Sequence, residues 1–299
     1  MILKQLNLKD KLVVEQFLRL NNHQLAVYAF ANIYIWRGLF KISWGVYKGS
    51  MLIFFQDNSG VFLYLSPLAK TLSIDALNKA FEIMGGLNKN KEVSRIENAQ
   101  AHELDFYSSQ GFAVKEKSKD YICLREDLAS LKGESFRHKR SSCNYFTKNF
   151  SYEYQPYSED CASACLRLYN TWAAERKLSH QEDFYHWCLD DSKIALKELL
   201  RVNINLGIEG RVVKVGHKVK AFSFGYKLNN DTFCILYEIA DLKIKGIAQF
   251  IFRQFCAELK NYKYINIMDD SGFENLKKVK LSYHPARVEP AYIVKIKNA

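Results

Sequence analysis

Several features that identify common protein classes are missing from this sequence. It has only 4 prolines in 299 residues and no low-complexity tract, which argues against disorder. No stretch approaches the roughly 20 apolar residues that span a bilayer, and the N-terminal segment lacks the uninterrupted apolar core of a signal peptide. We therefore expect a folded cytoplasmic protein without a transmembrane segment.

The common catalytic signatures are also missing. There is no GxSxG motif, no Walker loop and no dinucleotide fingerprint, so these hydrolase and nucleotide-binding classes are not indicated. Of the seven cysteines, Cys161 and Cys165 form one close pair, and no second pair completes a zinc site. The cysteines are expected to be reduced, buried thiols. The sequence predicts no metal site and no tightly bound cofactor.

What the chain does have is apolar residues and positive charge. Apolar residues make up 48% of the chain and aromatic residues 14%, so a core is easily supplied, and the net charge is +11. A basic protein favours polyanionic partners such as nucleic acid, phosphate cofactors or an acidic membrane face. Ordinary solubility charge explains the excess equally well. Attachment to anionic lipid has only this charge in its favour, because no basic amphipathic helix with a clear apolar face accompanies it.

Hydrophobic periodicity and turn residues predict an α/β (α+β) protein with a repeated order of elements. The expected elements of the first half are a helix at 9–20, a strand meander at 40–65, a helix at 73–86, a strand at 93–98, a helix at 101–111 and strands at 112–116 and 120–125. Those of the second half are a strand at 151–157, helices at 159–176 and 181–199, strands at 204–209, 211–216, 218–228 and 231–239, a helix at 246–260, a strand at 262–268, a helix at 272–280 and a strand at 287–297.

The repeated order suggests an ancient duplication. We expect an N-terminal domain at 1–125, a basic helical connector at 126–150 and a C-terminal domain at 151–299 that carries the candidate site. Each domain would be a mixed, mostly antiparallel sheet flanked by helices, and antiparallel hairpins that feed one strand–helix–strand crossover are typical of an N-acetyltransferase-like fold. In the first domain, Ser73 is expected to cap its helix and two glycines to stop it.

The segment "YEIADLKIKGIAQF" (237–250) contains a possible anion site. A predicted strand ends near Glu238, and Lys243, Gly246 and Ala248 follow where a helix begins. Free backbone N–H groups and the helix dipole favour an anion at such a start, and a glycine lets a ligand approach the backbone closely. The pattern also fits an ordinary strand–helix corner, so both interpretations stay open.

Two further stretches concentrate charge. In "KGESFRHKRSSCNYFTK" (132–148), the side chains of Arg137, Lys139 and Arg140 could contact nucleic-acid or cofactor phosphates, although a solvated connector fits as well. In "MDDSGFENLKKVKLSYHP" (268–285), acids such as Asp270 could do acid/base work or cap a helix. His284 precedes a proline, so we expect extended backbone there and a buried, hydrogen-bonded ring.

Four segments together resemble one bacterial family, that of the phosphatidylglycerol lysyltransferase C-terminal domain. They are "FANIYIWRGLFKI" (30–42), "DYICLREDLASLKGESFRHKRSSCNYF" (120–146), "TFCILYEIADLKIKG" (232–246) and "YINIMDDSGFENLKKVKLSYHP" (264–285). The matching positions are Asn32, Trp36, Arg37, Lys139, Arg140, Asn144, Glu238, Asp241, Gly246, Asn266, Asp270, Gly272, Lys280, Tyr283 and His284. The chain departs from the family pattern at Leu236, Ile239, Ile267 and Met268, where polar or charged residues are typical.

The resemblance implies two tandem N-acetyltransferase-like domains and transfer of an aminoacyl group from aminoacyl-tRNA, or of an acyl group from acyl-CoA, to an amine or hydroxyl acceptor such as a lipid headgroup. The candidate catalytic carboxylates are Glu238 and Asp241, with Asp270 behind them. The cofactor-binding candidates are Lys243, Gly246, Ala248 and Asn266, and Arg137, Lys139 and Arg140 would contact phosphate or tRNA. The alternative is a non-catalytic binding module that keeps the fold without the chemistry. We expect the amides near Gly246 to face an accessible crevice shared with the carboxylates.

Overall fold

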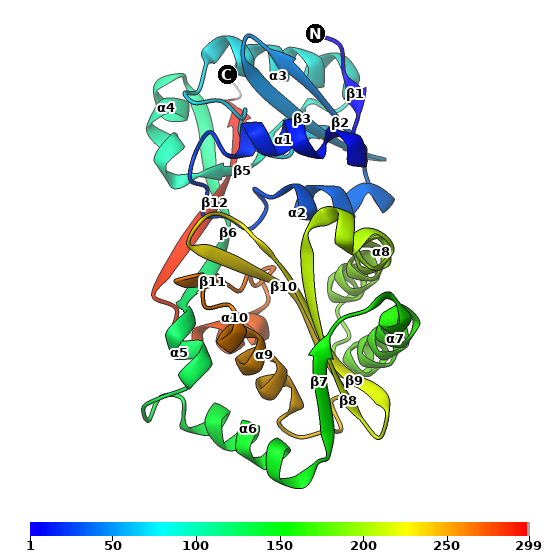
Figure 1. Cartoon of the computed structure of the whole chain (residues 1–299). Helices are drawn as coiled ribbons and strands as arrows, with labels where there is room; N and C mark the ends of the chain where they lie inside the picture. The colour runs from blue at the N-terminus through cyan, green and yellow to red at the C-terminus, as the bar shows by residue number, and fades with distance from the viewer. Residues whose placement is uncertain (298–299) are drawn as a thin grey trace. The chain divides into compact units, whose positions relative to one another are not determined.

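The structure of the chain is a computed structural model that describes residues 1–297, and its contacts divide it into two compact units (Figure 1). The second unit consists of Ile122–Met268 and Lys278–Arg287. The first unit contains Met1–Tyr121, Asp269–Lys277 and the segment that begins at Val288. The expected division into a domain at 1–125, a connector at 126–150 and a domain at 151–299 stays a prediction.

The first unit is built on a mixed sheet with strand order β1-β2-β3-β4-β5-β12-β6. Its strands are β1 (Lys4–Gln5), β2 (Lys41–Tyr47), β3 (Ser50–Asp57), β4 (Gly60–Leu63), β5 (Ile96–Gln100), β12 (Arg287–Ile296) and β6 (Phe112–Leu124), of which β12 and β6 each extend into the second unit. Its helices are α1 (Lys11–Leu18), α2 (Phe30–Ile35), α3 (Ile74–Leu87) and α4 (Leu104–Ser109), with 3-10 turns η1 (Leu8–Asp10), η2 (Trp36–Gly38), η3 (Lys91–Val93) and η4 (Ala101–Glu103).

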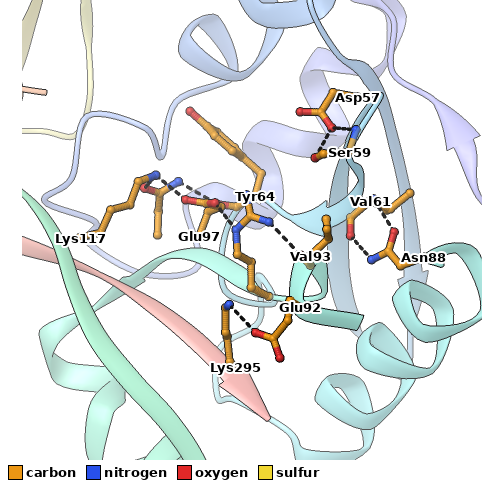
Figure 2. Close-up of polar contacts among 12 residues, drawn as sticks. Asp57, Ser59, Val61, Tyr64, Asn88, Glu92, Val93, Glu97, Lys117 and Lys295 are labelled. Carbon is orange, nitrogen blue, oxygen red and sulfur yellow. Dashed lines mark hydrogen bonds and ion pairs between the residues drawn. The ribbon is translucent and has the colours of Figure 1, made fainter. Parts of the chain in front are cut away.

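Helix α3 covers the core of this unit with a stripe of buried side chains that includes Leu77, Phe81 and Met84. Ser73 occupies its N-cap position, as expected, but the side chain makes no capping hydrogen bond. The two glycines do not stop the helix, which ends at Leu87. The stop comes one residue later, where the Asn88 side chain accepts from Val61 N at 2.6 Å and donates to Val61 O at 2.7 Å (Figure 2).

The second unit has the strand order β6-β11-β10-β9-β8-β7. Its other strands are β7 (Tyr152–Pro156), β8 (Ile208–Val215), β9 (Lys218–Lys227), β10 (Thr232–Ala240) and β11 (Tyr264–Asn266). Its helices are α5 (Arg125–Ser130), α6 (Arg137–Asn149), α7 (Ala162–Ser179), α8 (Asp183–Leu206) and α9 (Ile247–Glu258), together with the 3-10 turn η5 (Glu159–Cys161) and the second half of α10 (Glu274–Leu281). Figure 1 shows α7 and α8 on one face of this sheet and α9 on the other.

Strands β7 to β10 of the second unit pair antiparallel, whereas β10 and β11 run parallel and are joined by α9. The first five residues of β10, "TFCIL", are all apolar or small, and most of the strand is buried, as expected for a strand covered on both faces. Helix α9 places Ile247, Ile251 and Phe255 in the core at helical spacing. These mixed sheets flanked by helices confirm the predicted α/β class.

The expected strand at 204–209 is wrong in its first half. The helical segment α8 continues to Leu206 across a kink at Val202. Leu199 and Leu206, on either side of the kink, are both buried, and Gly207 then ends the segment with a left-handed φ of 71°. The strand begins only at Ile208.

Two further features bear on function. Six of the seven free cysteines are buried, as the sequence indicated. Within residues 1–297, no helix combines the length and the apolar character needed to cross a membrane.

Candidate functional site in the second unit

Glu238 lies on β10, beyond the point at which its parallel neighbour ends. The pairing of β10 with β11 stops at Cys234 and Asn266, whereas β10 continues to Ala240 along β9. The register with β9 shifts between Ile235 and Tyr237, which makes the intervening residue a β-bulge. The carboxylate is therefore presented where two parallel strands part.

The environment of Glu238 favours its neutral form more than water does. The side chain is half-buried, and burial raises the pKa of its carboxyl to about 7, against the opposing charges of Lys280 and Lys139. A carboxylate with a pKa near 7 is well matched to accept and return a proton at neutral pH. Glu238 therefore has the protonation behaviour that a general base at neutral pH needs.

Lys280 and Tyr283, three positions apart in the sequence, are further groups near Glu238. The ammonium group of Lys280 donates to the carbonyl of Ile267, at the end of β11. The ring of Tyr283 is buried, and burial together with the charge of Glu238 raises the pKa of its phenol. The sequence resemblance included both positions but gave neither a role; the lysine-rich run before Tyr283 was the available signal.

The carboxylate of Asp241 accepts two hydrogen bonds from within the protein. Its Oδ2 lies 2.7 Å from Lys220 Nζ, and its Oδ1 accepts the amide of Lys243 at 3.0 Å. Although burial raises the pKa of Asp241, these hydrogen bonds lower it overall, so the group stays ionised. The Lys243 side chain is exposed and pairs with Glu175 at 3.3 Å. Asp241 therefore shapes the turn before α9 and is poorly suited to take up a proton.

Gly246 makes the turn into α9 with a left-handed φ of 87°. A Cβ atom at this position would lie 2.0 Å from the carbonyl oxygen of Ser142, in α6. Glycine is thus required because the backbone of α6 approaches closely. One face of the turn is therefore closed by protein.

Some backbone donors of this turn have internal acceptors and others do not. The amide of Ile247 donates to Ile244 O at 3.4 Å, and that of Phe250 to Gly246 O at 2.9 Å. For Gly246 and Ala248, no amide acceptor is found among residues 1–297. The start of α9 therefore keeps donors that an anion could use.

Asn266 supports the end of β11. Its side chain is fully buried, and its Oδ1 accepts the amide of Met268 at 2.7 Å. Met268 itself has a φ of 62°. In this structure Asn266 holds the backbone where β11 leaves the sheet.

The three basic side chains of α6 that were predicted to contact phosphate form ion pairs or hydrogen bonds within the second unit. Arg137 pairs with Glu134 at 3.0 Å, and Arg140 donates to the carbonyls of Leu131 and Gly133. Lys139 turns toward the segment after α10, as described below. The side chains expected to contact phosphate thus also fasten α6 to its surroundings.

Asp270 belongs to the first unit. Its Oδ2 accepts a hydrogen bond of 2.5 Å from the phenol of Tyr121, and its Oδ1 accepts the amide of Gly272 at 2.9 Å. The carboxylate thus orders the loop before α10 within that unit. It accepts internal donors there.

His284 differs from the expectation. It is exposed rather than buried, its φ is 52° rather than extended, and its ring packs edge-on against Phe136 at 5.1 Å. The chain keeps turning after α10, because the amide of His284 donates to Leu281 O at 2.9 Å. These turn hydrogen bonds outweigh the preference that Pro285 imposes.

A second polar cluster, in the first unit, was not predicted. Glu97 on β5 pairs with Arg95 at 2.5 Å and with Lys117 at 2.6 Å, and Lys117 also donates to Asn98 (Figure 2). The positive charges hold the pKa of Glu97 below its usual range despite its burial. Because its charges are mutually paired, this cluster has the character of a structural network. No group of His, Cys, Asp and Glu suited to a metal ion occurs within residues 1–297.

Comparison with known families identifies the chain. The family described as "Phosphatidylglycerol lysyltransferase, C-terminal" matches residues 19–295. The chain belongs to this family. The resemblance seen in the sequence is thereby confirmed. No curated protein matches the sequence.

Solved structures resemble this member of the phosphatidylglycerol lysyltransferase C-terminal family over nearly its whole length. A conserved protein of unknown function from Bacteroides thetaiotaomicron has a TM-score of 0.87 and 28% identity, with 99% of this chain and 100% of that one covered. L-PGS from Bacillus licheniformis has a TM-score of 0.65 and 13% identity, covering 97% and 93%. A tandem GNAT protein from the clavulanic acid biosynthesis pathway has a TM-score of 0.53 and 9% identity, covering 100% and 99%. The tandem N-acetyltransferase-like fold is thus confirmed.

Proposed function

We propose that this chain is a group transferase that moves an aminoacyl or acyl group to an amine or hydroxyl acceptor, with Glu238 as the general base. The observation that carries the proposal is the position of Glu238. It is a half-buried carboxyl with a pKa of about 7, beside Lys280 and at the point where β10 and β11 part. Membership of a family named for lysyl transfer supports the reaction class.

The proposed step needs no resident cofactor. The acceptor nitrogen or oxygen attacks the donor carbonyl carbon, and the ionised Glu238 carboxylate takes the proton that the acceptor loses. When the tetrahedral intermediate collapses, the bond to the donor's ribose oxygen or thiol sulfur breaks. The protonated Glu238 then returns the proton to that leaving group. The positive charge of Lys280 favours the negative charge that develops at the carbonyl oxygen.

The start of α9 is the proposed contact for donor phosphate. The unused amides of Gly246 and Ala248 and the dipole of this 12-residue helix favour an anion. Lys243, whose exposed side chain pairs with Glu175, can add its charge. Because Gly246 is buried and α6 closes one face of it, the half-buried Ala248 would present its amide to the phosphate more readily.

We propose aminoacyl-tRNA as the first donor to examine, and acyl-CoA as the second. The family description and the net charge of +11 support the former. The hydrogen bonds from Arg140 to the carbonyls of Leu131 and Gly133 make it less available to tRNA, whereas Arg137 is exposed and pairs with the exposed Glu134. A phosphatidylglycerol headgroup and free amines are the acceptors to compare.

The experiment combines binding and turnover. Calorimetric titration with charged tRNAs and acyl-CoAs identifies the donor, and mass spectrometry then follows transfer to each acceptor. Glu238→Gln should bind the donor as the native chain does but lower turnover by about 100-fold or more. Glu209→Gln, at an exposed position of β8, is the matched control and should transfer normally. Turnover that survives Glu238→Gln would remove Glu238 from the mechanism.

The second candidate is a non-catalytic binding module. Ile239 and Ile267 are buried in the core, and Leu236 occupies the bulge beside Glu238, where the family pattern has polar residues. Fewer polar groups are then available to orient a reacting substrate. Donor binding without transfer to any acceptor in the same assay would favour this module.

A further inference from the structure

The N-terminal turn of α6 contacts the segment that follows α10. The Nζ atom of Lys139 donates to Ser282 Oγ at 2.7 Å and lies 3.7 Å from the ring centroid of Tyr283. Phe136, one residue before α6, packs against the ring of His284. The consecutive residues Ser282, Tyr283 and His284 are thus contacted by Lys139 and Phe136, at the start of α6.

Tyr283 is fixed from a second side as well. Its ring packs against Phe252 of α9 at 4.8 Å between ring centroids and is buried. Lys139 itself is half-buried, and burial lowers the pKa of its ammonium group while Glu238 raises it. A partly desolvated ammonium on an aromatic face makes a stronger contact than an exposed one.

We propose that Lys139 is a positioning residue for Glu238. It holds Ser282 and Tyr283 in place and keeps a positive charge near the Glu238 carboxylate. This inference rests on the proposed role of Glu238 as the base. In this role Lys139 acts through Glu238 and Tyr283.

The titratable groups that interact electrostatically with Glu238 come from several elements. Lys139 and Cys143 come from α6, Lys280 from α10, Tyr283 from the segment after it, and Cys256 from α9. Only the two lysines among these carry positive charge, and both lower the pKa of Glu238 against burial. Removal of Lys139 leaves Lys280 to oppose burial alone, so the carboxyl should hold its proton to higher pH.

The test measures the protonation of Glu238 directly. The chain is labelled with carbon-13 at the glutamate carboxyl, and the Glu238 signal is assigned by its loss in Glu238→Gln and followed by NMR from pH 4 to 10. The native midpoint is expected near pH 7. Lys139→Met should raise it by roughly 1 unit, and Lys139→Arg should restore most of that shift. Lys148→Met, at an exposed position of the same helix, should leave it unchanged.

Lys139→Gln separates charge from hydrogen bonding and covers the case in which Lys139→Met does not fold. It can keep the bond to Ser282 but has no charge, so the midpoint should still rise. An unchanged midpoint in a folded Lys139→Gln or Lys139→Met variant would overturn the proposal. Failure of the proposed function is distinct: Glu238→Gln would then transfer normally, whatever the titration shows.

Discussion

At the scale of single residues, Glu238 is where burial and charge act against each other. Burial raises the pKa of its carboxyl to about 7, compared with 4.5 in an unfolded chain. The folded state therefore binds this proton more tightly. The associated stability is fully present below pH 4.5 and is lost as the pH rises through about 7.

This linkage predicts how Glu238→Gln affects stability. The variant lacks the ionisable group, so it should gain roughly 2–3 kcal/mol over the native chain between pH 5 and pH 8. Urea unfolding of both proteins at several pH values measures the difference. A difference that does not change with pH would contradict the raised pKa.

Gly246 gives a second prediction at this scale. Gly246→Ala should lower the free energy of unfolding by about 3 kcal/mol or more, because the added methyl group would overlap Ser142 O and the left-handed φ is strained for alanine. Denaturant unfolding is the measurement. Gly216→Ala has a positive φ of 55° but no atom within 4 Å, so it should cost only about 1 kcal/mol. Equal losses would show that the close approach of α6 does not matter.

Residue types in the sequence predicted Glu238 and Asp241 as the first candidates, with Asp270 behind them, but could not separate Glu238 from Asp241. The ranking depends on partners far away in sequence: Lys220 for Asp241 and Tyr121 for Asp270. Likewise, the sequence indicated that Gly246 makes a turn but not that Ser142 lies against it.

At the scale of elements, α6 packs against the residues of the candidate site. Its Ser142 touches the glycine turn and its Lys139 holds Tyr283. One turn after Ser142, Phe146 is completely buried and packs against Phe250 of α9 at 4.9 Å between ring centroids. The helix that the sequence indicated as a connector is therefore part of the core of the second unit.

Phe146→Ala tests this role. It should destabilise the chain by about 3–5 kcal/mol, because a large buried ring is replaced by a cavity. Tyr145→Ala, at the neighbouring position, is 42% exposed and should cost less than about 1 kcal/mol. Thermal or denaturant unfolding distinguishes the two. A loss of stability for Phe146→Ala as small as that for Tyr145→Ala would mean that α6 is only loosely packed.

Element types were more predictable than their ends. Apolar periodicity located most helices and strands, since it reflects local burial. The extension of α8 to Leu206 was missed, because "NINL" fits a strand as well as a helix and only the packing of its apolar residues decides.

At the scale of the whole molecule, the net charge of +11 has a measurable consequence. If aminoacyl-tRNA is the donor, its affinity should fall with added salt, with a slope of log K against log salt of about −3 or steeper. Calorimetric or filter-binding titrations between 50 and 200 mM salt provide the test. Micromolar binding that does not change with salt would argue against tRNA and leave acyl-CoA.

The last strand also sets the order in which this chain can fold. Strand β12 pairs with β5 in the first unit, where Ala291 lies opposite Gln100, so nearly 200 residues separate the partners. During synthesis, this edge of β5 stays unpaired until β12 has left the ribosome. The N-terminal sheet is therefore completed last, and its open edge is where a nascent chain is most exposed to misassembly.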